Sequence, residues 1–566
     1  LSLKEGFTVF RDAEFSGDMN SRTVKRIGDV NLLRSVQFAE DAGPLAHPVR
    51  PASYIEISNF YTPTVYEKGA EVVRMVHTIV GAAAFRRGSD LYFERYDGQA
   101  VTTEDFLAAM TEASGADLSQ FQRWYDQAGT PSLHVTSQTA DGTLTLSITQ
   151  SCPATPGQTE KAPFHIPIGI GLLDDQGVSL VDSTLSCESD SELEIRGDTA
   201  LLHLKSEFSE VRFADLPEQV EVSFLRGFTA PVKVDFDRSN DSLSFLATRD
   251  SDGFSAWDAL QTMLVSEIEQ LGVSATVTEG VVDLYEALLD QALANTSATA
   301  EENFLLAAKL AIPDENYLFE QVDQVDVDQI CSARDRLRNT LGCRLADKWR
   351  TLLEANDLES AYAPDSLSMS RRALKNCALG YLVEDLDSET LSALLKGLYE
   401  KADNLTDRRA ILISAVNIES DSELSRELLR DFYDRWQDQA LVINQWFAVQ
   451  STGRYCNSKT LDMLLEHPAF TLENPNKVRS VLSLFATHNP RNFHAIDGGG
   501  YELIADNVIE LNGINPQMAA SLAKPLTRWR RYAGERRLLM RNTLGRISTV
   551  DELSSDVYEI VTKSLN

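Results

Sequence analysis

The sequence predicts a multidomain α+β fold with a helical lobe, a small antiparallel β domain and a large helical solenoid. The chain has 566 residues, and a hydrophobic core stops growing near 250–300 residues, so the chain must divide into several domains. Apolar residues follow the helical period in the first 130 residues and again from about residue 240 to the end, whereas between them the period is two. We therefore expect domains at residues 1–130, 131–231 and 232–566.

Residues 1–130 are expected to be mainly helical. The stretch YEKGAEVVRMVHTIVG places Ala70, Val73, Met75 and Val76 on one apolar stripe, and TEDFLAAMTEAS and LSQFQRWYDQAG give two further amphipathic segments. Between these helices, DAGPLAHPVRPASYIEISNFYTPT carries four prolines, which interrupt helices. We expect a helical lobe that is crossed by one long irregular passage.

The next hundred residues carry strand patterns. SLHVTSQTADGTLTLSITQ alternates Leu144, Leu146 and Ile148 with polar residues, and the Asp141-Gly142 pair before them is a hairpin signal. The segments FHIPIGIGLLDDQG, TALLHLKS and QVEVSFLRGF repeat this style, and after APVKVDF the strands stop. The pattern predicts a small antiparallel β-sandwich.

From about residue 240 the pattern is almost entirely helical. Segments such as SARDRLRNTLGCRLADKWRTLLEAN and LSALLKGLYEKADN are separated by short turns rich in acidic residues, Asn or Pro. Successive helix pairs without any strand to pack on are typical of a solenoid. We expect a curved superhelix of HEAT-like pairs, although the sequence has no clean repeat period.

Charge and cysteine content exclude several kinds of partner. The chain carries 52 Lys and Arg against 85 Asp and Glu, a formal net charge of −33, which argues against nucleic acid and anionic membranes as partners. No apolar run approaches the ~18–20 residues that span a bilayer.

The cysteines form no CxxC pair, so we expect reduced thiols in a cytoplasmic protein. They are Cys152, Cys187, Cys331, Cys343, Cys377 and Cys456.

The sequence contains none of the short motifs that usually identify a catalytic site. It has no HExxH, GxSxG or P-loop, and none of its eight histidines is paired with another at helical ligand spacing. We therefore expect no histidine-based metal site from this chain alone. The first residues read as the inside of a helix, without Met or a signal peptide, and we interpret Leu1 as a cut end.

Several segments, in order along the chain, carry a family resemblance. They include SLKEGFTVFRD, NFYTPTVYEKGAEVVRM, RWYDQAGTPSL, FLRGFTAPVK and NPNKVRSVLSLFATHNPRNFHAIDGGGY. This series resembles the M1 family of zinc metallopeptidases, in its bacterial aminopeptidase N type. The resemblance implies that residues 1–130 are part of a thermolysin-like catalytic domain. It also implies one Zn²⁺ ion and peptide substrates with a free N-terminus, and we expect a monomer.

The KEG segment matches the family's third metal ligand. In this family an HExxH helix supplies two histidine ligands and the general base, and a Glu about eighteen residues later completes the set. Glu5 takes that position, Lys4 is expected to line the site, and Asp12, two helical turns along the same face, matches an acid that orients a metal-bound imidazole. The alternatives are a capping box between Glu5 and Ser2 and a solvated acid at Asp12.

The TVYEKG segment matches the family's oxyanion donor. Tyr66 takes the position of a tyrosine whose phenol donates to the oxygen of the tetrahedral intermediate, and a phenol stays protonated at neutral pH. Glu67 is expected to line the same cleft. Arg479, in NPNKVRS, is a candidate for substrate contact from the helical domain, and the alternative is a surface ion pair.

Two functions remain open from the sequence. The first is a zinc aminopeptidase whose HExxH would precede Leu1, so that residues 1–566 alone are expected to bind little zinc and to be inactive. The second is a non-catalytic peptide-binding or scaffold module that keeps the β domain and the solenoid. The retained KEG and TVYEKG segments disfavour the second, because a scaffold has no use for an oxyanion tyrosine beside a ligand carboxylate.

Overall fold

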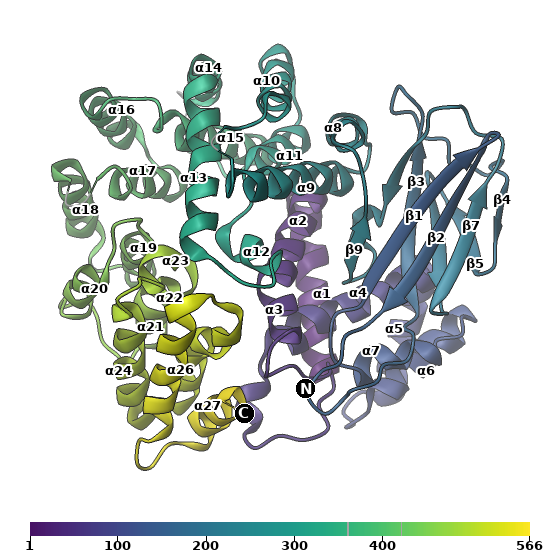
Figure 1. Ribbon diagram of the computed structural model, residues 1–566, viewed down its shortest axis with the longest axis horizontal. Coiled ribbons are helices and arrows are strands. Elements are labelled where there is room, and N and C mark those ends of the chain that lie inside the picture. The colour runs from purple at the N-terminus through teal and green to yellow at the C-terminus, as the bar shows by residue number, and fades with distance from the viewer. Residues whose placement is uncertain (275, 359–360, 420–421, 566) are drawn as a thin grey trace. The chain divides into compact units, whose positions relative to one another are not determined.

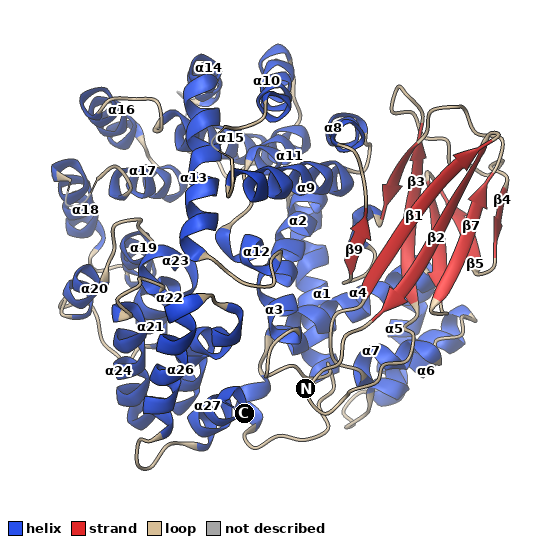
Figure 2. Cartoon of the chain, viewed as in Figure 1, coloured by secondary structure: helices blue, strands red, loops and turns tan. Residues whose placement is uncertain are grey.

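The computed structural model describes residues 1–274, 276–358, 361–419 and 422–565. They form two compact units, one made of Leu1–Tyr54 and Phe60–Met263, the other of Ile55–Asn59 and Leu264–Asn566. The elements are mostly helices with one group of strands (Figures 1 and 2), so the predicted fold class is confirmed. In the part of the chain described here, no helix is both long enough and apolar enough to cross a membrane.

Short helices make up the first part of the first unit. The α-helices are α1 (Ser2–Met19), α2 (Arg22–Leu32), α3 (Phe38–Asp41), α4 (Gly69–Val80), α5 (Ala82–Tyr96), α6 (Thr103–Ser114) and α7 (Arg123–Asp126). Two π-helical turns, η1 (Leu33–Gln37) and η3 (Thr64–Lys68), interrupt them, and the 3₁₀ turns η2 (Ile57–Phe60) and η4 (Gln120–Gln122) are short. The proline-rich passage between α3 and η3 is irregular apart from η2, as predicted.

The predicted apolar stripe forms part of the core of these helices. Ala70, Val73, Met75 and Val76 on α4 are all buried. Aromatic rings of α1, α5 and α6 pack beside them, as in the edge-to-face contact of Phe10 with Phe85, at 5.5 Å between centroids. Tertiary packing of this face, more than helix propensity, stabilises such short helices.

The strands form two sheets that follow these helices in the chain. They are β1 (Ser132–Ala140), β2 (Thr143–Ser151), β3 (Ile166–Leu173), β4 (Cys187–Ser189), β5 (Glu192–Arg196), β6 (Thr199–Leu204), β7 (Phe208–Phe213), β8 (Glu221–Phe224) and β9 (Lys233–Phe236). The sheet orders are β4-β7-β2-β1-β9 and β5-β6-β3-β8. Asp141 and Gly142 have positive φ angles of 49° and 73° between β1 and β2, as a tight hairpin requires.

One pairing departs from the expected antiparallel pattern. β9 runs parallel to β1 at the sheet edge, where the Lys233 N–H donates to the Pro131 carbonyl at 2.9 Å. A parallel partner needs a long connection, and the intervening strands of the domain supply it. β9 lies beyond residue 231, at which the sequence suggested a boundary, and the domain limits remain predictions.

A buried histidine pair lies between α7 and the sheet. His165, just before β3, lies 3.0 Å from His203 of β6, measured from Nε2 to Nδ1, and its carbonyl accepts from Trp124 Nε1 at 2.9 Å. Burial, and then the neighbouring His203, lower the pKa of His165 from 6.5 to about 3. The folded protein therefore keeps this imidazole neutral where the unfolded chain binds a proton.

We expect His165 to make the protein less stable in mild acid. Because its folded pKa is depressed, stability is lost as pH falls below about 6.5 and the loss continues to about pH 3. His165 should contribute about 2 kcal/mol to the loss between pH 7.5 and 5, and His165→Gln should remove this contribution in urea unfolding, while the part due to His494, whose pKa is also lowered by burial, should remain. His134→Gln, at an exposed pair with Asp235, is the control; an equal flattening there would contradict the assignment.

The helices after the sheets run to the end of the chain. They are α8 (Asn240–Arg249), α9 (Gly253–Leu271), α10 (Glu279–Ala294), α11 (Ala300–Leu310), α12 (Glu315–Glu320), α13 (Val327–Arg344), α14 (Ala346–Asn356), α15 (Ser366–Leu382), α16 (Ser388–Lys401), α17 (Leu405–Val416), α18 (Glu423–Trp436), α19 (Ala440–Ser451), α20 (Ser458–Leu465), α21 (Pro475–Val478), α22 (Leu484–His488), α23 (Pro490–Phe493), α24 (Gly499–Ile514), α25 (Pro516–Ala523), α26 (Gly534–Ser548) and α27 (Ser555–Leu565). A π-helical turn, η6 (Arg479–Ser483), lies between α21 and α22. The predicted all-helical region is confirmed.

Acidic turns define where many of these helices begin. Asp314, Asp326, Asp365 and Asp387 each accept a backbone N–H of the first turn of the helix that follows, which is the usual work of an N-cap. Part of the acidic excess of the chain is therefore structural.

A segment of the irregular passage belongs to the second unit. The buried carboxylate of Glu559, on α27, accepts the N–H groups of Ile55 at 3.2 Å and Glu56 at 3.0 Å, and the Asn59 side-chain amide at 3.0 Å. These bonds satisfy backbone groups that lie outside any regular element. They explain why Ile55–Asn59 groups with helices far away in the sequence.

A candidate active site around Glu5 and Tyr66

Two glycines let the backbones of α1 and α4 meet directly. A Cβ atom added at Gly6 would lie 2.6 Å from the Gly69 carbonyl carbon, and one at Gly69 would lie 3.3 Å from the Gly6 Cα. Gly6 follows Glu5, and Gly69 ends the TVYEKG segment that carries Tyr66. This crossing therefore brings the two predicted site residues together from elements that are distant in sequence.

Glu5 is a buried carboxylate at the start of α1. Its side chain is 9% exposed and forms an ion pair with Lys4, whose side chain is 71% exposed. The capping-box alternative is wrong, because α1 has no side-chain cap and the Ser2 hydroxyl instead donates to the Val49 carbonyl at 2.6 Å. The exposed ammonium group of Lys4 is therefore a cation beside the buried Glu5 carboxylate.

Tyr66 faces this carboxylate from η3. Partial burial, the charge of Glu5 and a hydrogen bond with Glu5 raise the pKa of the Tyr66 phenol above its ordinary value of 10.0. The ring of Tyr61 lies 6.2 Å from that of Tyr66. The phenol therefore keeps its proton at neutral pH, as a hydrogen-bond donor must.

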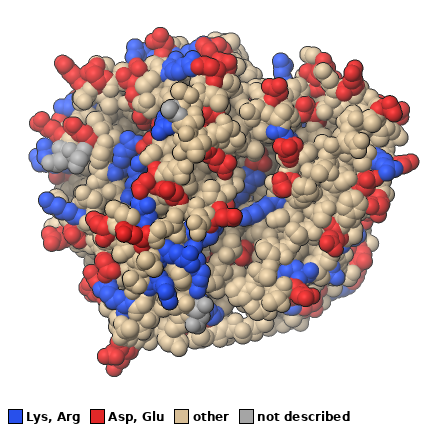
Figure 3. Space-filling model, in the orientation of Figure 1, with Lys and Arg blue, Asp and Glu red and all other residues tan. Residues whose placement is uncertain are grey.

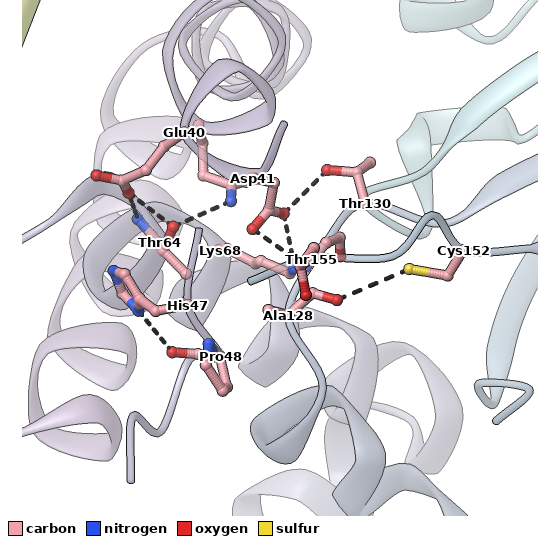
Figure 4. Close-up of polar contacts among 12 residues, drawn as sticks. Glu40, Asp41, His47, Pro48, Thr64, Lys68, Ala128, Thr130, Cys152 and Thr155 are labelled. Carbon is pink, nitrogen blue, oxygen red and sulfur yellow. Dashed lines mark hydrogen bonds and ion pairs between the residues drawn. The ribbon is translucent and has the colours of Figure 1, made fainter. Parts of the chain in front are cut away.

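A buried ion pair anchors η3 (Figure 4). Lys68 Nζ lies 2.8 Å from Asp41 Oδ2, with both side chains 1% exposed, and it also donates to the Gly129 carbonyl at 2.8 Å. Asp41 accepts from the Thr130 hydroxyl at 2.9 Å as well. Each charge is thus satisfied by more than one partner, as buried ions require.

Hydrogen bonds to a second acid of α3 hold Thr64, the first residue of η3. Glu40, next to Asp41 on α3, accepts both the N–H of Thr64, at 3.0 Å, and its hydroxyl, at 2.7 Å (Figure 4). Adjacent acids of α3 thus hold the two ends of the π-helical turn that presents Tyr66. π-helical turns are uncommon and occur frequently at functional sites.

The remaining predicted residues lie in different surroundings. Glu67 is half-buried, and burial followed by the nearby Asp29 raises the pKa of its carboxyl. Asp12 is exposed. Arg479 belongs to the other unit, on η6, where it is exposed and donates to Asn476 Oδ1 at 3.1 Å. Their roles stay predictions.

The residues present do not complete a zinc site. Within the described ranges, no group of three or more His, Cys, Asp or Glu side chains could hold a metal ion, whereas a catalytic zinc takes three protein ligands. Glu5 alone offers one carboxylate.

Sequence reasoning missed the residues that support the site. The sequence analysis assigned no role to Asp41, Lys68, Gly6 or Gly69. The one sequence feature that could have pointed to the two glycines is their place in the KEG and TVYEKG motifs, where each directly follows a charged residue. Recognising them as a crossing requires knowing which helices touch.

Models of three protein families match successive parts of the chain. Residues 1–125 match the Peptidase family M1 domain, residues 129–237 match a domain of unknown function (DUF3458) with an Ig-like fold, and residues 240–566 match a domain of unknown function (DUF3458_C) with ARM repeats. The last match alone covers more than half of the chain.

Relatives match along the whole chain. It is 39% identical to aminopeptidase N of Escherichia coli (strain K12), 38% to that of Haemophilus influenzae and 41% to that of Caulobacter vibrioides. Each match covers 100% of this chain and 64%, 64% and 63% of the relative. The crystal structure of Legionella pneumophila aminopeptidase A in complex with aspartic acid matches with a TM-score of 0.85 at 27% identity.

The chain thus spans a little under two thirds of the length of these relatives, and 62% of the solved structure. The order of the matched domains follows the order of helical lobe, sheets and helical region in the structure. The chain belongs to the M1 peptidase family, in its bacterial aminopeptidase N group.

Proposed function

We propose that this protein is a zinc aminopeptidase that removes N-terminal residues from peptides. The observation that carries the proposal is the juxtaposition of Glu5 and Tyr66 across the Gly6–Gly69 crossing. Membership of the M1 family, with relatives named aminopeptidase N, supports the reaction class. The six free cysteines support the further proposal of a cytoplasmic protein.

In this proposal each candidate site residue has a defined task. Tyr66 donates its phenolic hydrogen to the oxygen that becomes negative in the tetrahedral intermediate, and a donor already in place lowers the barrier. Glu5 is proposed as one carboxylate ligand of zinc, Lys4 and Glu67 as lining groups, Asp12 as an orienting acid and Arg479 as a substrate contact. The described residues do not complete the metal site, since Glu5 is the one ligand they supply in this proposal.

The first test is the reading frame around the codon for Leu1. An HExxH motif about eighteen residues before Glu5 would support the proposal, and the longest gene product should then bind zinc and hydrolyse aminoacyl p-nitroanilides. Residues 1–566 alone should do neither. A start codon at or just before Leu1, with no zinc bound, would favour the peptide-binding scaffold instead.

The second test is Tyr66→Phe in the active gene product. Removing one preorganised oxyanion donor should lower kcat by about 10²–10³-fold, with zinc content unchanged. Tyr61→Phe is the matched control, since this exposed neighbour contacts the Tyr66 ring but has no assigned chemistry. A comparable loss of kcat in both variants, or none in Tyr66→Phe, would reject the role of Tyr66.

A further inference from the structure

The second unit contains a cavity lined by four arginines. Its volume is about 490 Å³, and its walls come mainly from α13, α15, α17, the turn after α19, and α23. In Figure 1 these helices surround one region, and in Figure 3 basic side chains run through the same region of that face. The cavity lies within one unit and is lined by none of the candidate site residues discussed above.

The local charge balance is opposite to that of the whole chain. Four arginines line the cavity against three carboxylates, whereas the chain has 52 basic and 85 acidic residues. Such a reversal in a concave site concentrates positive potential there. The arginines are Arg334, Arg338, Arg454 and Arg491, and the acids are Glu315, Asp335 and Glu384.

The ion pairs leave one positive charge in excess. Arg334 pairs with Glu315 at 3.2 Å and Arg338 with Glu384 at 3.3 Å. The remaining carboxylate, Asp335, is shared by two guanidinium groups, of which that of Arg454 lies at 2.8 Å and that of Arg491 also forms a hydrogen bond. One further negative charge would neutralise the cavity.

Backbone carbonyls fix the orientation of three of the four guanidinium groups, whereas the fourth, that of Arg454, is held by Asp335. Arg334 Nε donates to the Pro313 carbonyl at 2.6 Å, and Arg338 Nη2 to the Gly380 carbonyl at 2.7 Å. Arg491 Nη2 donates to the Cys331 carbonyl at 2.6 Å. A guanidinium has five N–H donors in a planar fork, so groups held in this way are preorganised for a planar oxyanion.

The rest of the lining is partly aliphatic. Val383, Leu391 and Ile413 contribute to the walls, and the volume falls within the range of small-molecule sites. A single excess charge suits a monoanion better than a phosphate dianion. We propose that this cavity binds a small monocarboxylate with an aliphatic side chain, such as an acylated amino acid or the C-terminal residue of a peptide.

Calorimetric titration of the full chain tests this assignment directly. N-acetyl-L-leucine should bind saturably, whereas its amide, which lacks the charge, should not. Arg454→Gln should weaken binding about tenfold or more, because a charge-assisted hydrogen bond is lost. Arg546→Gln is the matched control, since Arg546 has similar exposure and pairs with acids of α24 outside the cavity.

A second variant guards against a folding defect in the first. Asn417 lines the cavity, and its Oδ1 accepts the backbone N–H of Arg454 at 2.7 Å. Asn417→Asp keeps an oxygen acceptor for this backbone N–H and adds one negative charge to the cavity, so binding of the monocarboxylate should be abolished. Equal binding of acid and amide, tighter binding of inorganic phosphate, no saturable binding, or equal weakening in Arg546→Gln would each overturn the proposal. The readout is independent of peptidase activity.

Discussion

Replacing Lys68 with methionine is expected to lower the free energy of unfolding by about 3–5 kcal/mol, because it leaves a buried carboxylate without its counterion. Lys68 and Asp41 are each 1% exposed, and the ammonium group bonds both Asp41 and the Gly129 carbonyl. Methionine keeps most of the side-chain volume, so the loss reports the charge more than a cavity. Urea unfolding of the full chain, followed by circular dichroism, measures it.

Two further variants separate the buried charge from other causes. Lys68→Met combined with Asp41→Asn removes both charges and should cost less than Lys68→Met alone, since no unpaired ion remains. Arg86→Gln breaks the exposed pair with Asp90 and should cost at most about 1 kcal/mol. If Lys68→Met behaved like Arg86→Gln, the ion pair would not anchor η3.

Substituting Gly6 with alanine is expected to destabilise the first unit by about 1–3 kcal/mol, as overpacking usually does. The new methyl group would lie 2.6 Å and 2.7 Å from the backbone carbonyl carbon and oxygen of Gly69, and backbone atoms cannot rotate away. The helices must separate, which moves Glu5 away from Tyr66. Thermal unfolding measures the first effect, and a fall in the Tyr66 pKa toward its ordinary value measures the second.

Alanine substitutions at two other glycines serve as references for the destabilisation expected from Gly6→Ala. Gly69→Ala creates a milder contact, 3.3 Å from the Gly6 Cα, and should cost less than Gly6→Ala. Gly28 lies inside α2, and beyond the neighbouring backbone of that helix no atom lies within 4 Å of an added Cβ, so Gly28→Ala should stabilise by about 0.4–1 kcal/mol. A ranking in which Gly6→Ala is as benign as Gly28→Ala would show that the crossing is not a close backbone contact.

Local patterns predicted most of the elements because their causes are local. Apolar periodicity placed the α4 stripe, the Asp141-Gly142 pair placed the β1–β2 hairpin, and prolines marked the irregular passage. The parallel β1–β9 pairing was missed because it joins the two ends of the domain, and no local signal carries that information.

The candidate site residues came from resemblance to a family and not from physical pattern. Glu5 and Tyr66 have unremarkable neighbours in the sequence, and their proximity depends on which helices cross. The tight approach at Gly6 and Gly69, and the burial of Lys68 beside Asp41, are properties of the folded chain. A charge cannot be recognised as buried until its surroundings are known.

By itself, the sequence determined the succession of helices and strands, the family, and the identity of the candidate site residues through their motifs. Tertiary structure alone decided which of these residues meet, how the π-helical turn is anchored, and that arginines from separate helices surround one cavity. The physical reason is that periodicity and turn chemistry act within a few residues, whereas burial, ion pairing and desolvation depend on neighbours brought together from distant parts of the chain.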